Sequence, residues 1–191
     1  MLFRHRPTTA QIRAFIAAQA QTPFSYRAVG ASRHAPPAGY TCDHNRIELG
    51  RGPVVFDSAV AALRRWQMFA VDGVELCWPS APIEAGTTVA ILAGGRGVWS
   101  LNACRIVYVV DEEDGVRRIG FAYGTLADHA VRGEERFLIE WSRQSDAVHY
   151  DLLAFSRPGS LLVGLGRPLL RAVQRRFARQ SLEAMRRTVS P

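Results

Sequence analysis

The sequence predicts an α+β fold in which a curved antiparallel sheet of about seven strands wraps around a long C-terminal helix. Alternating apolar and polar residues, interrupted by turn residues, fill residues 71–156. The connections between these segments are short, which favours antiparallel neighbours. A helical apolar pattern then runs over residues 168–187. Since the sheet and this helix each need a partner for their apolar surface, we expect them to pack together with room between them.

The whole chain, residues 1–191, is expected to form a single domain, with residues 1–39 as an N-terminal helix and irregular extension. Its 48% hydrophobic content is sufficient for a substantial core. Thr8, followed by Ile12, Phe15 and Ile16, predicts a short amphipathic helix over residues 8–20. Residues 23–39 are rich in Gly, Pro and Ser, so they are predicted to be an irregular connection.

The middle of the chain is predicted to hold one strand, one helix and six further strands. Residues 40–49 alternate as a strand, and residues 54–69 form a helix because Phe56, Val60 and Leu63 recur on one face. The six further strands are expected at residues 74–78, 87–93, 98–110, 116–126, 134–142 and 148–155. The turn at residues 111–115, DEEDG, indicates a hairpin whose acidic residues are solvated, in preference to a metal site.

The last helix is predicted to be amphipathic, with Leu169, Val173 and Phe177 on its apolar face. Its arginines form a stripe on the opposite face, at Arg167, Arg171, Arg175 and Arg179. Such a stripe is a candidate surface for weak contact with an anionic membrane, although a solvated helix face is the preferred interpretation. The stripe belongs to a basic C-terminal segment, because residues 157–191 contain eight arginines and one acidic residue.

Several classes of protein are excluded by what the sequence lacks. The three cysteines are far apart, which favours reduced thiols in the cytoplasm over a disulfide framework. No apolar segment has the length of a signal peptide or a membrane span. P-loops, serine nucleophile elbows and CxxC pairs are absent, so no cofactor and no metal is expected. Nucleic acid is not an expected partner, since no binding motif accompanies the arginines.

The most informative segment is residues 120–137, GFAYGTLADHAVRGEERF, where ionisable residues gather within strand-like sequence. In its first strand, Gly120, Ala122 and Gly124 leave one face nearly bare. We interpret this bare face as a place of close packing in preference to a ligand surface. The candidate ligand-binding residues in and near this segment are Arg105, Tyr108, Tyr123, His129, Glu134, Glu135 and Arg136.

Two carboxylates in this segment are predicted to point in opposite directions. Glu134 and Arg136 share one strand face, while Glu135 shares the other with Phe137, so at least one carboxylate faces inward. A buried carboxylate needs a cation or hydrogen-bond donors, and Arg105 is the expected partner. The alternative is a structural ion pair at the rim of the sheet.

His129 lies in the connection between two strands, near Asp128. It is a candidate proton-transfer group, with a carboxylate to orient it, although a solvated or turn-capping histidine is the more ordinary interpretation. Tyr108 and Tyr123 are expected to provide hydroxyl groups to the same site. The sequence assigns no catalytic residue.

Several long segments, in order, resemble the uncharacterised protein family 0548 of bacteria and plants. They are LGRGPVVFDSAVAALRRWQMF from Leu49, NACRIVYVVDE from Asn102, residues 120–137, AFSRP from Ala154 and RAVQRRFARQSLEAM from Arg171. The resemblance implies a helix-grip fold, related to START-type and pollen-allergen-like domains that bind hydrophobic molecules between sheet and C-terminal helix. It implies no established activity and no catalytic residues.

Three functions are therefore open. The first is binding of a small hydrophobic or amphipathic molecule in a cavity between the sheet and the last helix, with Arg105 and Glu134 or Glu135 at its polar end. The second is an enzyme on the same pocket, performing hydrolysis, cyclisation or isomerisation with His129 or a carboxylate as general base. The third is a peripheral membrane or interaction module that docks through the arginine stripe.

Overall fold

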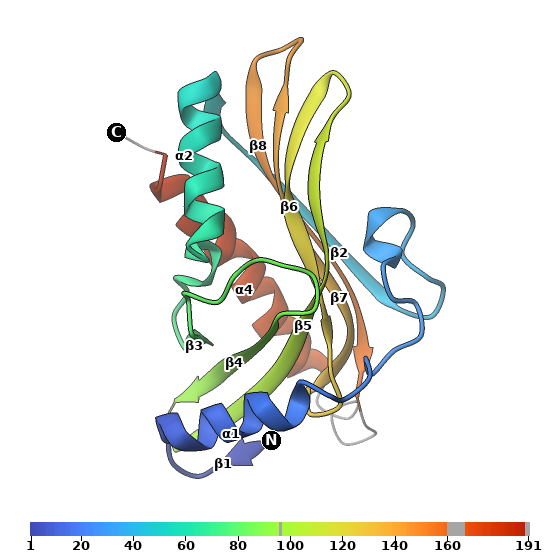
Figure 1. The fold of residues 1–191 in the computed structure, drawn as a ribbon, viewed down its shortest axis with the longest axis vertical. Coiled ribbons are helices and arrows are strands. Elements are labelled where there is room, and N and C mark those ends of the chain that lie inside the picture. Colours follow the sequence, from blue (N-terminus) through green and yellow to red (C-terminus); the bar gives the residue numbers. More distant parts are fainter. Residues whose placement is uncertain (96, 160–166, 190–191) are drawn as a thin grey trace.

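The computed structural model describes residues 1–95, 97–159 and 167–189 (Figure 1). Within these residues the chain forms one antiparallel sheet in the order β2-β8-β7-β6-β5-β4-β3, with the short β1 paired to β5. The elements are β1 (Leu2–Phe3), α1 (Thr9–Gln19), η1 (Ala31–Arg33), β2 (Thr41–Arg51), α2 (Pro53–Arg64), η2 (Gln67–Phe69), β3 (Val74–Cys77), β4 (Thr88–Gly95), β5 (Val98–Glu113), β6 (Val116–Thr125), β7 (Val131–Ser142), β8 (Ala147–Pro158) and α4 (Arg167–Arg187).

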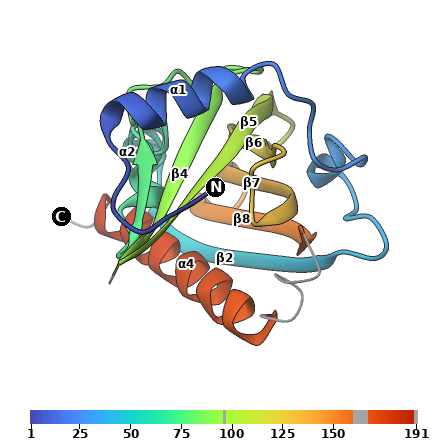
Figure 2. The same ribbon diagram turned by 90° about the horizontal axis from the view of Figure 1, so that it is seen from below.

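Figure 2 shows the sheet as an arc, with α4 across its open side and α1 on its outer side. This is the helix-grip arrangement, in which an antiparallel sheet curls around a long C-terminal helix, and it confirms the predicted fold class. All seven predicted strands are present, with ends that differ by a few residues. The strand β1 was not predicted, because two residues carry no alternation and its pairing partner lies in β5.

The predicted helix over residues 54–69 is divided in two. The α-helical part ends before Arg65, and Trp66 adopts a left-handed backbone conformation with φ of 57°. Its buried indole donates a hydrogen bond to the carbonyl oxygen of Ala81 at 3.1 Å. The turn η2 then directs Phe69 toward the concave face of the sheet, so the interruption supplies an aromatic side chain to the core.

The main core lies between the concave face and the helical layer of α2, η2 and α4. The sheet contributes large buried side chains such as Phe121, Phe137 and Tyr150, which pack against Phe56 of α2 and Met185 of α4. Burying each of these side chains stabilises the fold by about 1.5–3 kcal/mol before conformational entropy is counted. These side chains fix α2 and the second half of α4 to the concave face.

The convex face is covered by N-terminal segments. Ile12 and Phe15 of α1 pack on β3, β4 and β5, and residues 24–33 cross β5, β6 and β7. A Cβ atom added to Gly124 would lie 2.2 Å from the hydroxyl oxygen of Tyr26. The close packing expected at the bare face of β6 is therefore confirmed, and Tyr26 provides it.

The predicted apolar face of α4 is only partly covered. Leu169 and Val173 are 72% and 51% exposed, whereas Phe177 is partly buried against the core. The buried positions of α4 are Ala178, Ser181, Ala184 and Met185, so the helix packs tightly through its second half. None of the helices in the described ranges is long and apolar enough to cross a lipid bilayer.

Candidate functional site

A cavity of about 310 Å³ lies between the concave face of the sheet and the first half of α4. Its wall is mainly apolar and includes three aromatic rings, from Phe69 of η2, Tyr123 of β6 and Phe177 of α4. Leu152 and Ala154 of β8 extend the apolar wall. The half-exposed Val173 also lines the cavity, which places an opening to solvent beside α4.

Glu135 and Tyr123 place polar atoms in this apolar cavity. They are paired across β7 and β6, and the Tyr123 hydroxyl donates a hydrogen bond to Oε2 of Glu135 at 2.5 Å. Burial raises the pKa of Glu135 to about 7, partly offset by this hydrogen bond, and Asp43 raises it slightly further. Burial also holds the pKa of Tyr123 well above its ordinary value, so the phenol keeps its proton.

A second polar group joins the cavity wall to α4. Both oxygens of Asp43 on β2 accept hydrogen bonds from the guanidinium of Arg171, one of them at 2.5 Å. Arg171 also donates to Oε1 of Gln174 at 3.0 Å, and Gln174 donates to the hydroxyl of Ser156 at 3.0 Å. This bidentate pair neutralises the charge of Asp43 and holds the first half of α4 over the cavity.

His129 lies in the cavity wall, but no carboxylate contacts its ring within the described ranges. Its Nδ1 accepts a hydrogen bond from the backbone N–H of Val131 at 3.1 Å. Asp128 instead accepts from the amide of Gln19 at 3.0 Å. Burial lowers the pKa of His129 to about 4, so the imidazole is neutral at physiological pH.

Glu134 has its carboxylate on the convex side of the sheet, away from the polar groups of the cavity. Its oxygens accept hydrogen bonds from the Tyr26 hydroxyl at 2.6 Å and from the backbone N–H groups of Gly30 and Ser32 at 2.7 and 3.0 Å. The Ser32 hydroxyl donates a further hydrogen bond. The backbone of Glu134 belongs to the strand beside the cavity, but its carboxylate attaches the segment around η1 to the sheet.

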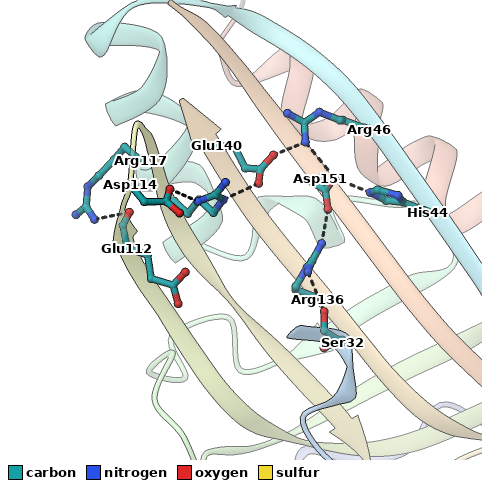
Figure 3. Close-up of polar contacts among 10 residues, drawn as sticks. Ser32, His44, Arg46, Glu112, Asp114, Arg117, Arg136, Glu140 and Asp151 are labelled. Atoms are coloured by element: carbon teal, nitrogen blue, oxygen red, sulfur yellow. Dashed lines mark hydrogen bonds and ion pairs between the residues drawn. The ribbon is translucent and has the colours of Figure 1, made fainter. Parts of the chain in front are cut away.

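Tyr108 and Arg136 belong to the same convex-face network. The hydroxyl of Tyr108 lies 2.6 Å from that of Ser32. Figure 3 shows Arg136 between Ser32 and Asp151, donating to the carbonyl oxygen of the first at 2.8 Å and to the carboxylate of the second at 3.0 Å. Asp151 in turn contacts His44 at 2.6 Å. These contacts are a structural network across the outer surface of the sheet.

The predicted pairing of Arg105 with an inward carboxylate is wrong. Arg105 points to the convex face, where its guanidinium donates to the carbonyl oxygens of Gln19 and Ala20 at 2.9 and 2.8 Å. It also donates to the hydroxyl of Thr88 at 3.2 Å. A cation is favourable at these unpaired carbonyls, so Arg105 caps the C-terminus of α1.

The arginine stripe of α4 is also divided. Arg171 pairs with Asp43, whereas Arg175 and Arg179 are exposed. The side chain of Arg167, the first residue of the stripe, lies outside the described residues. The stripe therefore includes one arginine that fixes the helix to the sheet and two that face solvent.

The structure brings together a set of cavity residues that the sequence did not identify as one site. Of the predicted site residues, Tyr123, Glu135 and His129 lie in its wall beside the backbone of Glu134, and the additional wall residues include Asp43, Asn45, Phe69, Gln174 and Phe177. The sequence contains a signal for Asp43 and Asn45, because every second residue of a strand lies on the same face and these two therefore share a face with Ile47. The helical residues required knowledge of how α4 and η2 lie on the sheet.

Comparison with known proteins identifies relatives over nearly the whole chain. A family model described as "Domain of unknown function (DUF1990)" matches residues 25–184. A UPF0548 protein of Dictyostelium discoideum is 37% identical over 202 residues, covering 96% of this chain and 94% of its own. A UPF0548 protein of Deinococcus radiodurans is 38% identical over 193 residues, covering 94% of each chain. The predicted resemblance to family 0548 is confirmed.

Solved structures are less similar to this chain than its sequence relatives are. The crystal structure of Ara h 8.0201 gives a TM-score of 0.44 at 9% identity, covering 79% of this chain and 98% of that chain.

Proposed function

We propose that this chain, which belongs to the DUF1990 family, the UPF0548 proteins, binds a small hydrophobic or amphipathic molecule in the cavity between its sheet and α4. The observation that supports this most directly is the cavity itself. It is about 310 Å³ in volume and lies on the concave face of the sheet, beside the packed core under α2, η2 and the second half of α4. Natural ligand sites are concave, mainly apolar and supplied with a few polar groups, as this cavity is.

Glu135 and Tyr123 are the groups that would fix the polar end of the ligand. Both lie in the wall, and they form a hydrogen bond only with each other among the contacts of the described side chains. A carboxylate has about four acceptor positions, so one hydrogen bond from Tyr123 leaves most of them for a ligand. The apolar wall would hold the remainder of the molecule through area burial.

The experiment that tests this proposal is native mass spectrometry of the purified protein, followed by denaturing extraction of any bound small molecule. The matched variants are Ala154→Phe, which fills the cavity from β8, and Ala172→Phe, which adds the same side chain at an exposed position of α4. We expect a molecule at defined stoichiometry in the parent and in Ala172→Phe, and its loss in Ala154→Phe. Equal occupancy in all three proteins would place the molecule outside the cavity and contradict the proposal.

An enzyme is the second candidate, because a carboxyl group with a pKa of about 7 can both donate and accept a proton at physiological pH. Glu135 would be its general acid or base, with Tyr123 as a hydrogen-bond donor to developing negative charge. His129 is a weaker choice, since its pKa of about 4 makes it a poor base. Conversion of an extracted ligand by the parent, lost in Glu135→Gln, would establish this candidate.

The exposed side of α4 suggests how a carrier would meet an anionic membrane. Leu169 and Val173 are exposed apolar side chains at its N-terminal half, and Arg175 and Arg179 follow them. Apolar insertion combined with arginine and phosphate attraction is typical of interfacial helices. Binding to anionic vesicles that weakens with salt and with Arg175→Ala/Arg179→Ala would support this contact. Salt-independent binding would count against it.

The proposed setting is the cytoplasm. Cys42, Cys77 and Cys104 are all free thiols in the structure. Reduced cysteines are typical of that compartment.

A further inference from the structure

We infer that the ligand of the cavity is a hydrophobic ammonium compound, whose cationic group binds Glu135 inside an aromatic wall. This inference rests on the proposed binding function and names the chemical class that the site would select. It follows from the balance of charge in the cavity and from the position of three aromatic rings.

Among the described residues of the cavity wall, Glu135 is the carboxylate that faces the concave side without a cationic partner. Asp43 is neutralised by its bidentate pair with Arg171. Glu134 directs its carboxylate to donors on the convex face. Among the described residues, the carboxylate of Glu135 accepts a hydrogen bond only from the neutral hydroxyl of Tyr123. Glu135 is partly buried, and a carboxylate withdrawn from water is costly without a compensating charge, so a ligand cation would complete the site.

The aromatic rings of the wall suit the same class of ligand. The ring centroid of Phe69 lies 5.4 Å from that of Phe177 and 6.3 Å from that of Tyr123. All three rings line the cavity together with Glu135. The negative face of an aromatic ring attracts an alkylammonium group, and aromatic walls combined with a carboxylate recognise such cations.

The opposite charge class is disfavoured by the same residues. A fatty acid or another carboxylate would bring a second negative charge near Glu135. The guanidinium of Arg171, which contacts the wall residues Asp43 and Gln174, is already bound by both oxygens of Asp43. His129 remains neutral and so offers no positive charge. The cavity therefore selects cations over anions of similar size.

The preference is expected to depend on pH through Glu135. The ionisable groups around it are Tyr123 on β6, Cys104 on β5, Tyr150 on β8, Asp43 on β2 with its partner Arg171 on α4, and His129 in the wall. Burial keeps Tyr123, Cys104 and Tyr150 protonated, and His129 titrates near pH 4. Glu135, with its pKa of about 7, is thus the group that changes charge between pH 6 and pH 8.

The test compares three probes that share one alkyl chain: octyltrimethylammonium, octanol and octanoate. Their affinities are measured by isothermal titration calorimetry with the full chain, after removal of any molecule that co-purifies. At pH 8 we expect octyltrimethylammonium to bind at least about tenfold more tightly than octanol, and octanoate to bind most weakly. Between pH 8 and pH 6 the affinity for the cation should fall about tenfold, because Glu135 becomes protonated.

Two variants assign the preference to its residues. Glu135→Gln keeps the shape and an acceptor for Tyr123, so it should fold and lose the preference for the cation, which then binds no more tightly than octanol. Glu183→Gln removes an exposed carboxylate of α4 by the same substitution and should leave all three affinities unchanged. Phe177→Leu should weaken binding of the cation more than that of octanol, because a leucine has no aromatic face.

The outcomes separate the inference from the proposed function. If octanol binds as tightly as the cation, or if the preference persists in Glu135→Gln, the ammonium assignment is wrong while a binding cavity remains. If octanoate binds most tightly, the charge argument is wrong. If none of the probes binds, the proposed cavity function fails, and the inference fails with it.

Discussion

Glu134 and Glu135 are neighbours in sequence, yet they occupy opposite sides of β7 and have different surroundings. Glu134, 3% exposed, accepts hydrogen bonds from Tyr26, Gly30 and Ser32 on the convex face. Glu135, on the concave face, accepts one from Tyr123 inside an apolar cavity. The carboxylate of Glu134 therefore has several hydrogen-bond donors from its own chain. The carboxylate of Glu135 has one, which leaves acceptor positions for a ligand.

The difference shows how burial of the same chemical group can serve stability or function. A buried carboxylate with several donors is a strong structural contact, because each donor also loses its partner if the carboxylate is removed. A carboxylate with one neutral donor remains costly to ionise, which raises its pKa. Such an imbalance is typical of a binding or catalytic position.

The largest expected effect on stability comes from removing the carboxylate of Glu134 on the convex side. Glu134→Ala should lower the free energy of unfolding by about 4 kcal/mol, because four donors lose a buried acceptor. Urea denaturation at neutral pH measures it. Glu112→Ala, at an exposed carboxylate 52% accessible, should cost less than about 0.5 kcal/mol. A similar small cost for both variants would show that the network around Glu134 is not structural.

On the concave side, substitution of Glu135 is expected to increase the free energy of unfolding, not to lower it. The pKa of Glu135 rises from the ordinary value of 4.5 to about 7 on folding, so the folded state binds more protons in this range. The contribution of Glu135 to stability is therefore present below pH 4.5 and is lost as the pH rises through 7. Glu135→Gln should increase the free energy of unfolding by about 3 kcal/mol at pH 8 and change it little at pH 4.

The comparison of this variant with the parent is needed at each pH because His129 titrates in the opposite direction. Its pKa falls from 6.5 to about 4 on folding, so its contribution to stability is lost as the pH falls through this range. The difference between parent and variant removes the effect of His129. A difference that is equal at pH 4 and pH 8 would mean that Glu135 ionises as an ordinary surface carboxylate.

The cover of the convex face can be tested through Gly124, where a Cβ atom would lie 2.2 Å from the Tyr26 hydroxyl oxygen. Gly124→Ala should cost about 2 kcal/mol, because Tyr26 cannot move without losing Glu134. In a Tyr26→Ala background the same substitution should cost little, and the coupling energy from thermal or urea unfolding measures the contact. Additive costs would show that Tyr26 does not fill this site.

The smallest effect is expected from the hydroxyl of Tyr123. Tyr123→Phe should change the free energy of unfolding by about 1 kcal/mol, because one hydrogen bond is lost. It should also raise the pKa of Glu135 further, because the Tyr123 hydroxyl stabilises the ionised carboxylate. Carboxyl carbon NMR titration reads the pKa directly. Tyr26→Phe, which removes a hydroxyl from Glu134 on the other face, is the matched control and should leave the titration of Glu135 unchanged. An unchanged pKa in Tyr123→Phe would contradict the pairing.

Much of the fold follows from local patterns. The alternation of β6 and β7 predicts both strands and the opposite directions of Glu134 and Glu135, since strand side chains alternate strictly. The interruption of the second helix at Trp66 was not predictable, because a left-handed tryptophan is retained only by its tertiary contacts. The exposure of Leu169 and Val173 was not predictable, because helical periodicity does not show that the first half of α4 lies over a cavity and the second half over the core.

The site was predicted less well than the fold. Arg105 was assigned to an inward carboxylate, since the sequence indicates neither which face of β5 it occupies nor that α1 ends beside it. Asp43 and Arg171 are 128 residues apart in the chain, and their pairing depends on the placement of α4 over β2. Long-range pairs of this kind leave no periodic signal.

The fold class, the family and the cluster of ionisable residues around Glu134 and Glu135 can be identified from the amino-acid sequence, because they depend on local periodicity and on motifs in order. The tertiary structure alone decided which residues share a cavity. Burial, and therefore the pKa of Glu135, arises from surrounding segments such as η2 and α4 that are distant in the chain. Whether a carboxylate stabilises the fold or remains available to a ligand depends on the number of donors that those distant segments supply.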